Sequence, residues 1–254
     1  MRHLFTPEGE SELAALVARR PLLGFDFDGT LAPIVAQPEL ARVPMATLRR
    51  LRQLASRLPL AVISGRSVAD LRSRLGFEPT YVVGSHGAED PHHERPASWS
   101  AALEGVRERL HEAADELQRA GVRVEDKGAS LALHYRLSAD RATARGAIER
   151  ALHPLDPRLH VFGGKMVVNV VPAGADDKAA ALRRLAVRTG ANAVLYLGDD
   201  VNDESVFAAA EPSWLSVRVG VHRGSAARYF IAGPHEVPRL LDRILALIGV
   251  PAAR

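Results

Sequence analysis

Two aspartates one residue apart follow an apolar run near the start of the chain, in the segment LLGFDFDGTLAPI at positions 22–34. Charge at the end of a buried strand costs solvation free energy, so Asp26 and Asp28 indicate chemistry that needs them. A hard cation such as Mg²⁺ takes oxygen ligands, and a second acidic segment, GDDVNDE at 198–204, supplies Asp199 as a partner for Asp26. Because neighbouring anions raise the proton affinity of the carboxylate that lacks the metal, Asp28 is the candidate for a group kept protonated near neutral pH.

Two simpler interpretations of these acidic segments fit the sequence less well. A calcium loop of the EF-hand type requires glycine at its sixth position, but counting from Asp26 that position is Leu31, and counting from Asp200 it is Ser205. A turn or helix cap at the Asp-Gly pair 28–29 would explain the first segment alone. It leaves the second segment without an explanation, so an oxygen-ligated cation is favoured.

The elements that position these residues alternate between strands and helices. Runs of strand length that end in polar residues occupy 21–30, 58–67, 80–89 and 192–200, and helical patterns occupy 43–57, 68–76 and 176–190. This alternation predicts the α/β class with a doubly wound parallel sheet. Because ligands bind beyond the carboxyl ends of such strands, we expect one cluster of Asp26, Asp28, Ser64, His86 and Asp199.

Residues 90–170 break this alternation and predict an inserted α+β cap domain, with 1–89 and 171–254 as the catalytic core. The expected order is a long helix at 98–121, a hairpin at 122–136 that turns at Lys127-Gly128, a helix at 138–152 and one further strand at 160–171. In the second arm of the hairpin, alternation places Ala132, His134 and Arg136 on the face opposite Leu131, Leu133 and Tyr135.

The composition bounds the class of protein. The chain has 254 residues, of which 47% are apolar and 25% charged, as in globular proteins. It has no cysteine, which excludes disulfides, thiolate metal sites and cysteine nucleophiles. The net charge of +3 is spread along helices rather than gathered, no apolar run approaches a membrane span, and the start lacks the order of a secretory signal. We expect a cytoplasmic monomer without a nucleic-acid or membrane partner.

Four separated motifs carry a family resemblance. DFDGTLAPI, ISGRS, the lysine of DDKAAAL and GDDVNDESVF occur in the order and spacing of the haloacid dehalogenase (HAD) superfamily of phosphatases. GSHGAE, EDKGASLALHYR and GKMVV resemble, more closely, the trehalose-6-phosphate phosphatase family. The resemblance covers about residues 22–246. It implies a Rossmann-like HAD core with a cap, the cofactor Mg²⁺, and hydrolysis of a small sugar phosphate.

The resemblance also implies a role for each matching residue. Asp26 would attack phosphorus to form an aspartyl-phosphate, and Asp28 would act as acid and then as base. Phosphate would contact Thr30, Ser64, Gly65 and Lys178, and the metal would contact Asp26, Asp28 and Asp199. Asp200 and Asp203 would lie behind these ligands, and one of them would hold Lys178 or a metal-bound water. The residues expected to contact the sugar are Arg66, His86, Gly87, Glu125, Lys127, His134, Arg136, Lys165 and Asn169.

One segment departs from the family pattern. Before Pro172 the family usually has an acidic residue followed by a basic one, whereas this chain has Asn169 and Val171. This departure keeps open a phosphatase for sucrose, glucosylglycerol or mannosylglycerate phosphate. A non-catalytic protein of the same fold that binds a sugar phosphate or nucleic acid is the other alternative. The presence of all five residues Asp26, Asp28, Ser64, Lys178 and Asp199 argues against it.

Overall fold

The computed structural model of the protein describes residues 1–94, 96–164 and 166–249. These residues form two compact units, which are described separately below. The first unit consists of the described residues of Met1–Gly87 and Asp176–Arg254, and the second unit of those of Ala88–Ala175.

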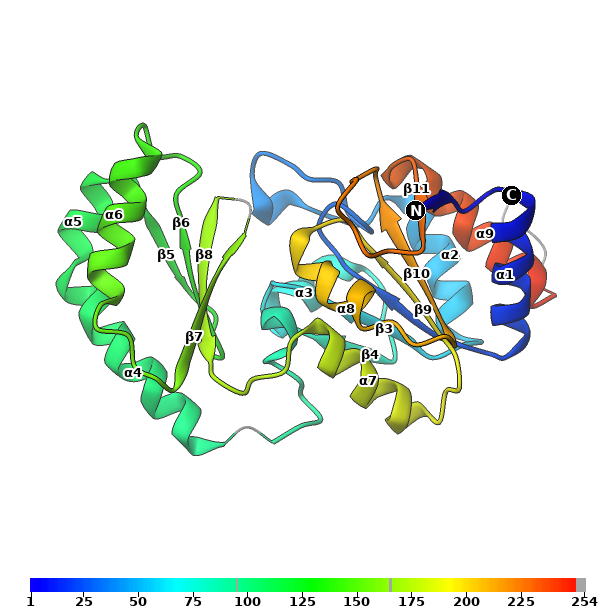
Figure 1. The fold of residues 1–254 in the computed structure, drawn as a ribbon, viewed down its shortest axis with the longest axis horizontal. Coiled ribbons are helices and arrows are strands. Elements are labelled where there is room, and N and C mark those ends of the chain that lie inside the picture. The colour runs from blue at the N-terminus through cyan, green and yellow to red at the C-terminus, as the bar shows by residue number, and fades with distance from the viewer. Residues whose placement is uncertain (95, 165, 250–254) are drawn as a thin grey trace. The chain divides into compact units, whose positions relative to one another are not determined.

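A parallel sheet of seven strands forms the centre of the first unit, counted over the described residues (Figure 1). Its order is β1-β11-β10-β9-β2-β3-β4, and every neighbouring pair runs parallel. The topological switch point of the sheet is at β2, because the chain continues to β3 and β4 on one side of β2, whereas β9, β10 and β11 lie on its other side. Ligands bind beyond the carboxyl ends of the strands at such a point. We call the side of the sheet on which these strands end the carboxyl edge. The strands are β1 (Arg2–His3), β2 (Leu22–Phe25), β3 (Leu60–Ile63), β4 (Tyr81–Val83), β9 (Val194–Gly198), β10 (Trp214–Val219) and β11 (Tyr229–Ile231).

Helices cover both faces of this sheet. On one face α1 (Pro7–Ala18), α2 (Met45–Ala55), α3 (Val68–Leu75) and α9 (Val237–Leu247) share an apolar core with the strands. On the other face α7 (Lys178–Thr189) and α8 (Glu204–Ala208) form a second core, and Figure 1 shows α7 well apart from α1 and α9. Helix α7 packs closely over β2, since a Cβ atom on Gly24 would lie 2.9 Å from side-chain atoms of both Leu182 and Tyr196.

The sequence prediction of the α/β class with a parallel sheet is confirmed. All four predicted strands form, as β2, β3, β4 and β9, and the three predicted helices form as α2, α3 and α7. Helices α3 and α7 end where glycine was expected to end them, because Gly76 and Gly190 adopt left-handed φ angles of 69° and 66°. Short 3₁₀ helices connect other elements: η1 (Pro38–Leu40), η2 (Ser85–Gly87), η3 (Val201–Asp203) and η4 (Pro234–Glu236).

The second unit is an antiparallel sheet with helices on one face (Figure 1). Its described strands lie in the order β5-β6-β8-β7: β5 (Arg123–Asp126), β6 (Leu131–His134), β7 (Leu159–Gly164) and β8 (Val167–Pro172). The helices are α4 (Ala97–Glu112), α5 (Ala114–Arg119) and α6 (Arg141–Leu152). Leu131, Leu133 and Val170 face these helices in a shared apolar core, so alternation turns Ala132, His134 and Asn169 to the opposite face.

Two expectations for this unit are wrong. The single helix expected at 98–121 is two helices, α4 and α5, that meet at Ala113. The sequence has no helix breaker at Ala113, so local propensity does not explain the interruption. The single strand expected at 160–171 is the antiparallel pair β7 and β8, with Gly164 opposite Val167. An apolar run that contains two adjacent glycines is compatible with one strand or with two.

Candidate active site

Lys178 joins two carboxylates in the interior of the first unit. Asp26 is the first residue beyond β2, Lys178 is the first residue of α7, and Asp203 ends η3. The Nζ atom of Lys178 donates to Oδ1 of Asp26 at 2.6 Å and to Oδ1 of Asp203 at 2.8 Å. Exposure is 4% for Asp26, 3% for Lys178 and 0% for Asp203. The three charges therefore interact with little screening by water.

Asp203 holds this arrangement in place. The hydroxyl of Tyr196 donates to Oδ1 of Asp203 at 2.7 Å, and the backbone N–H of Asp200 donates to its Oδ2 at 2.9 Å. Both oxygens of Asp203 thus accept hydrogen bonds from the protein. Asp203 lies close to Gly198, where a Cβ atom would be 2.3 Å from Cγ of Asp203.

Burial and charge shift the pKa values of these groups. Burial raises the pKa of Asp26 well above its usual value; Lys178 opposes this shift, and the anions Asp203 and Asp199 add to it. Burial alone would lower the pKa of Lys178, but Asp203 and Asp26 raise it, so the ammonium form is maintained. Burial and the nearby Asp203 raise the pKa of Tyr196, which keeps its hydroxyl as a donor.

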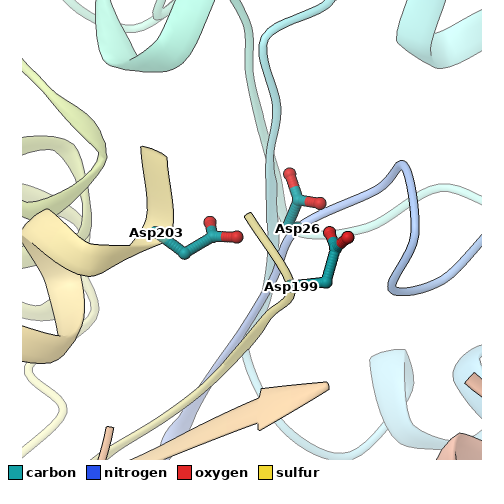
Figure 2. Close-up of side chains that lie close together, drawn as sticks. All are labelled: Asp26, Asp199 and Asp203. Atoms are coloured by element: carbon teal, nitrogen blue, oxygen red, sulfur yellow. The ribbon is translucent and has the colours of Figure 1, made fainter. Parts of the chain in front are cut away.

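A third carboxylate completes the cluster. Asp199 follows β9, the neighbour of β2 in the sheet, so the parallel register brings Asp199 beside Asp26. One carboxylate oxygen from each of Asp26, Asp199 and Asp203 lies within 4.8 Å of the others. Figure 2 shows Asp26 and Asp199 close together, with the carboxylate of Asp203 directed toward them. Gly29 (φ 83°) borders the cluster, and a Cβ atom there would lie 2.3 Å from Oδ2 of Asp199.

The donor set fits a hard divalent cation. Three carboxyl groups face one ammonium group, and all the donors of the cluster are oxygens. Because the oxygens of Asp203 already accept from Lys178, Tyr196 and Asp200, the carboxylates best placed to bind a cation are those of Asp26 and Asp199.

Asp28 lies in a different environment from the one expected. Arg66 donates to both of its oxygens at 2.7 Å, and also to Asp70 at 2.7 Å and to the Pro38 carbonyl at 2.8 Å. Burial would lower the pKa of Arg66, but Asp28 and Asp70 raise it. The carboxylate of Asp28 is thus ion-paired to a cation, and it is not a member of the cluster of three.

The predicted phosphate-binding residues lie at the carboxyl edge. Thr30 follows β2, and its buried Oγ1 has no hydrogen-bond partner within the described chain. Ser64 follows the adjacent β3, and its Oγ accepts from the backbone N–H of Arg66 at 3.3 Å. A Cβ atom on Gly65 would lie 2.4 Å from the ring of His86, which belongs to η2 after β4. The structure therefore places Ser64, Gly65 and His86 against one another.

The predicted sugar-binding residues of the second unit lie mainly on the face away from its helices. His134 Nε2 and Glu125 Oε2 are hydrogen-bonded at 2.8 Å, and Lys127 Nζ lies 3.8 Å from the same oxygen. The hydrogen bond from His134 holds the pKa of Glu125 below its usual value, with support from Lys127. Arg136 is exposed beyond the end of β6, and Lys165 lies outside the described residues.

Asn169 occupies the middle of this sheet. It pairs in register with Ala132 on one side and Phe162 on the other, and it is 3% exposed. Its Nδ2 atom has no hydrogen-bond partner in the part of the chain that the structure describes. A buried N–H donor without a partner is costly, so this position suits an acceptor group of a ligand or water.

Two residues with direct contacts to the acidic segments were not identified from the sequence. Tyr196, which donates to Asp203, stands inside the apolar strand β9. Arg218, which contacts the backbone of Asp199 and Asp200, stands in β10. Both look like ordinary strand residues, and the sequence carried no signal for either.

Comparison with known proteins gives a consistent result. A family model described as trehalose-phosphatase matches residues 24–234. A Mycobacterium marinum protein named trehalose-phosphate phosphatase is 34% identical over an alignment 250 residues long that covers 92% of this chain and 64% of that protein. A Mycobacterium tuberculosis protein named as an uncharacterized glycosyl hydrolase is 37% identical over an alignment 247 residues long that covers 90% of this chain and 18% of that protein. The chain thus spans less than two thirds of these curated relatives.

Solved structures confirm the predicted HAD fold. The C-terminal domain of Candida albicans trehalose-6-phosphate phosphatase has a TM-score of 0.75 and 23% identity, covering 94% of this chain and 97% of that one. A haloacid dehalogenase-like hydrolase from B. subtilis has a TM-score of 0.59 and 20% identity, covering 87% of this chain and 98% of that one. Within the described residues, none of the helices has both the length and the apolarity needed to cross a membrane.

Proposed function

Because this chain belongs to the trehalose-phosphatase family, we propose that it is a Mg²⁺-dependent phosphomonoesterase that hydrolyses trehalose 6-phosphate to trehalose and phosphate. The observation that carries the proposal is the buried Lys178, which binds Asp26 and Asp203 beside Asp199 at the carboxyl edge. Phosphoryl transfer needs positioning and charge neutralisation, and this cluster supplies both.

Asp26 is the nucleophile in this proposal. Lys178 holds Oδ1, which leaves Oδ2 to attack phosphorus in line while the bond from phosphorus to the sugar oxygen breaks. The product of this step is an aspartyl-phosphate, which water then hydrolyses. Two easier steps replace one difficult hydrolysis, and the positive charge of Lys178 favours the phosphate at the N-terminus of α7.

Asp28 is the acid and base. It gives a proton to the departing sugar oxygen and later takes one from the water that releases phosphate. Because both of its oxygens accept from Arg66 in this structure, the ion pair must open and the carboxylate must take up a proton from water before Asp28 can act as the acid. Substrate binding would open it if Arg66 turned to the sugar phosphate, which agrees with the role of Arg66 expected from the sequence.

The remaining contacts neutralise charge and orient the substrate. Thr30, Ser64 and Gly65 bind phosphoryl oxygens, and the Thr30 hydroxyl, which has no hydrogen-bond partner in the described parts of the chain, supports this role. A bound Mg²⁺ would be held by the carboxylates of Asp26 and Asp199 and the backbone of Asp28, and would neutralise charge on the phosphoryl group. Asp200 lies behind these ligands. The sugar contacts are assigned to Arg66, His86, Gly87, Glu125, Lys127, His134, Arg136, Lys165 and Asn169.

Asn169 favours a second candidate substrate. Its buried Nδ2 atom, which has no hydrogen-bond partner among the described residues, can donate to a hydroxyl or ether oxygen, but it brings no charge to the position. A phosphatase for sucrose, glucosylglycerol or mannosylglycerate phosphate would use the same catalytic cluster. We further propose a cytoplasmic monomer without a nucleic-acid partner, which size-exclusion chromatography with light scattering and a DNA-binding assay would test.

The decisive experiment measures phosphate release from a panel of these sugar phosphates, with Mg²⁺ and with EDTA. The proposal predicts Mg²⁺-dependent turnover that is fastest with trehalose 6-phosphate, and none by the Asp26→Asn protein. Turnover of another sugar phosphate without trehalose 6-phosphate would select the second candidate. No turnover of any member, together with tight binding of one of them or salt-dependent binding of DNA, would indicate the non-catalytic alternative.

A further inference from the structure

Arg218 is a buried basic residue beside the acidic segment 198–204, and none of the catalytic roles above includes it. It lies in β10 directly opposite Gly198, the last residue of β9, and is 8% exposed. A guanidinium group removed from water is costly unless other groups satisfy it. The partners of Arg218 therefore indicate what it does.

Those partners are the backbone of the acidic segment and one glutamate. One terminal nitrogen of Arg218 donates to the carbonyl oxygen of Asp199. The other donates to the carbonyl oxygen of Asp200 at 3.3 Å and to Oε1 of Glu204 at 2.7 Å. The pairing of β9 with β10 ends at Gly198, so the carbonyls of Asp199 and Asp200 lie past the last paired residue of these two strands. Arg218 supplies the donors that the sheet does not.

Glu204 extends the same contact to a second segment. Its Oε2 accepts the backbone N–H of Ala226 at 2.9 Å, while its Oε1 accepts from Arg218. Ala226 lies between β10 and β11. The chain that leaves β9 is thus fixed to β10 by Arg218 and to the segment after β10 through Glu204.

We infer that Arg218 is a positioning residue for the cation ligand Asp199, an inference that rests on the cation site of the proposed function. The direction in which the chain leaves Gly198 decides where the Asp199 carboxylate lies, and Arg218 fixes that direction through two consecutive carbonyls. The carboxylate has little room on its other side, because it packs against Gly29. Arg218 acts through the backbone, and Asp199 itself binds the cation.

The test is a titration with Mn²⁺ alone, followed by electron paramagnetic resonance of the free ion. Arg218→Met keeps an unbranched apolar stem and removes the donors, and we expect the Kd for Mn²⁺ to rise by about 10- to 100-fold. Arg218→Lys keeps the charge but not the fork of donors, so an intermediate rise is expected. Arg228→Met is the matched control, since Arg228 forms a half-exposed ion pair with Glu12 and should leave the Kd unchanged.

The readouts separate positioning from a merely structural role. If Arg218→Met is folded and has a lower melting temperature but the wild-type Kd, Arg218 is structural and the inference is overturned. If Arg218→Met does not fold, Arg218→Lys decides, and a wild-type Kd in that variant overturns the inference as well. Absence of Mn²⁺ binding by the wild type would also overturn it. Because no sugar phosphate is present in the titration, an error in the proposed substrate does not change the result.

Discussion

Gly29→Ala is the substitution whose effect the structure specifies most closely. Gly29 has a φ of 83°, and an L-residue in that region costs about 1–2 kcal/mol. Its new Cβ atom would lie 2.3 Å from Oδ2 of Asp199, whereas ordinary contacts begin at 3.4 Å. The carboxylate of Asp199 must therefore move by roughly 1 Å, and a displacement of that size in a catalytic site costs about 10²-fold in rate.

Gly190→Ala is the matched control. Gly190 ends α7 with a φ of 66°, so alanine meets the same backbone penalty there, but a Cβ atom at this position has nothing within 4 Å. Both variants should lose about 1–2 kcal/mol of stability, which lowers the melting temperature by about 2–8 °C in a chain of this size. Only Gly29→Ala should also move a cation ligand.

The assay compares kcat/KM on the best substrate of the panel, and Mn²⁺ affinity without substrate, for the two variants and the wild type. Gly29→Ala should lose about 100-fold or more in kcat/KM, equal to about 2.7 kcal/mol, and should bind Mn²⁺ more weakly. Gly190→Ala should retain wild-type values for both. If the two variants show the same kcat/KM and the same Mn²⁺ affinity, the position of Asp199 against Gly29 has no part in function, and the reasoning is refuted.

Three further predictions concern individual carboxylates. Asp26→Asn should abolish phosphate release, because the amide oxygen cannot attack phosphorus. The protein should stay folded, because this oxygen can still accept a hydrogen bond from Lys178. Turnover at the wild-type rate would exclude Asp26 as the nucleophile. Asp203→Asn should lower the free energy of unfolding, measured in urea, by about 3–5 kcal/mol because it breaks a buried ion pair. Asp199→Asn should lower it much less, because this change removes a like charge beside Asp26. Equal losses in the two variants would contradict this difference. Glu125→Gln should be less stable than the wild type by up to about 1 kcal/mol at neutral pH. The folded-state pKa of Glu125 lies below 4.5, so this difference should be present above pH 4.5 and disappear as the pH falls through the folded value; a difference that does not change with pH would refute it.

Much of the first unit could be predicted because its signals are local. Strands β2 and β9 are short apolar runs that stop at an aspartate, and α3 and α7 stop at Gly76 and Gly190. Since parallel strands share one carboxyl edge, the aspartates at two such strand ends could be placed together without coordinates. The proximity of Asp26 and Asp199 agrees with that placement.

The contacts that could not be predicted depend on which segments become neighbours in the fold, and the local sequence does not encode this. The contact of Arg218 with Asp199 exists only because β10 lies beside β9, and the ion pair of Arg66 with Asp28 only because β3 lies beside β2. The neutral strand residue Tyr196 gains its role in the same way, from α7 and η3 packed against β9. Within the second unit, the hairpin β7–β8 could not be told from one long strand by periodicity alone.

Positive φ angles combined with close contacts constrain the backbone at the carboxyl edge of the first unit. Gly76 and Gly190 adopt left-handed φ only to end helices, and a Cβ atom there would meet nothing closer than 3.3 Å. Gly29 and Gly87 also have positive φ, but a Cβ atom on Gly29 would meet Asp199 at 2.3 Å, and one on Gly87 would meet the Asp177 carbonyl at 2.5 Å. Ser85 and His86, two residues that normally avoid this region, adopt it beside Gly87. Unfavourable backbone conformations persist where surrounding contacts enforce them, and here they border Asp199 and the N-terminus of α7, the groups that the proposed chemistry must hold still.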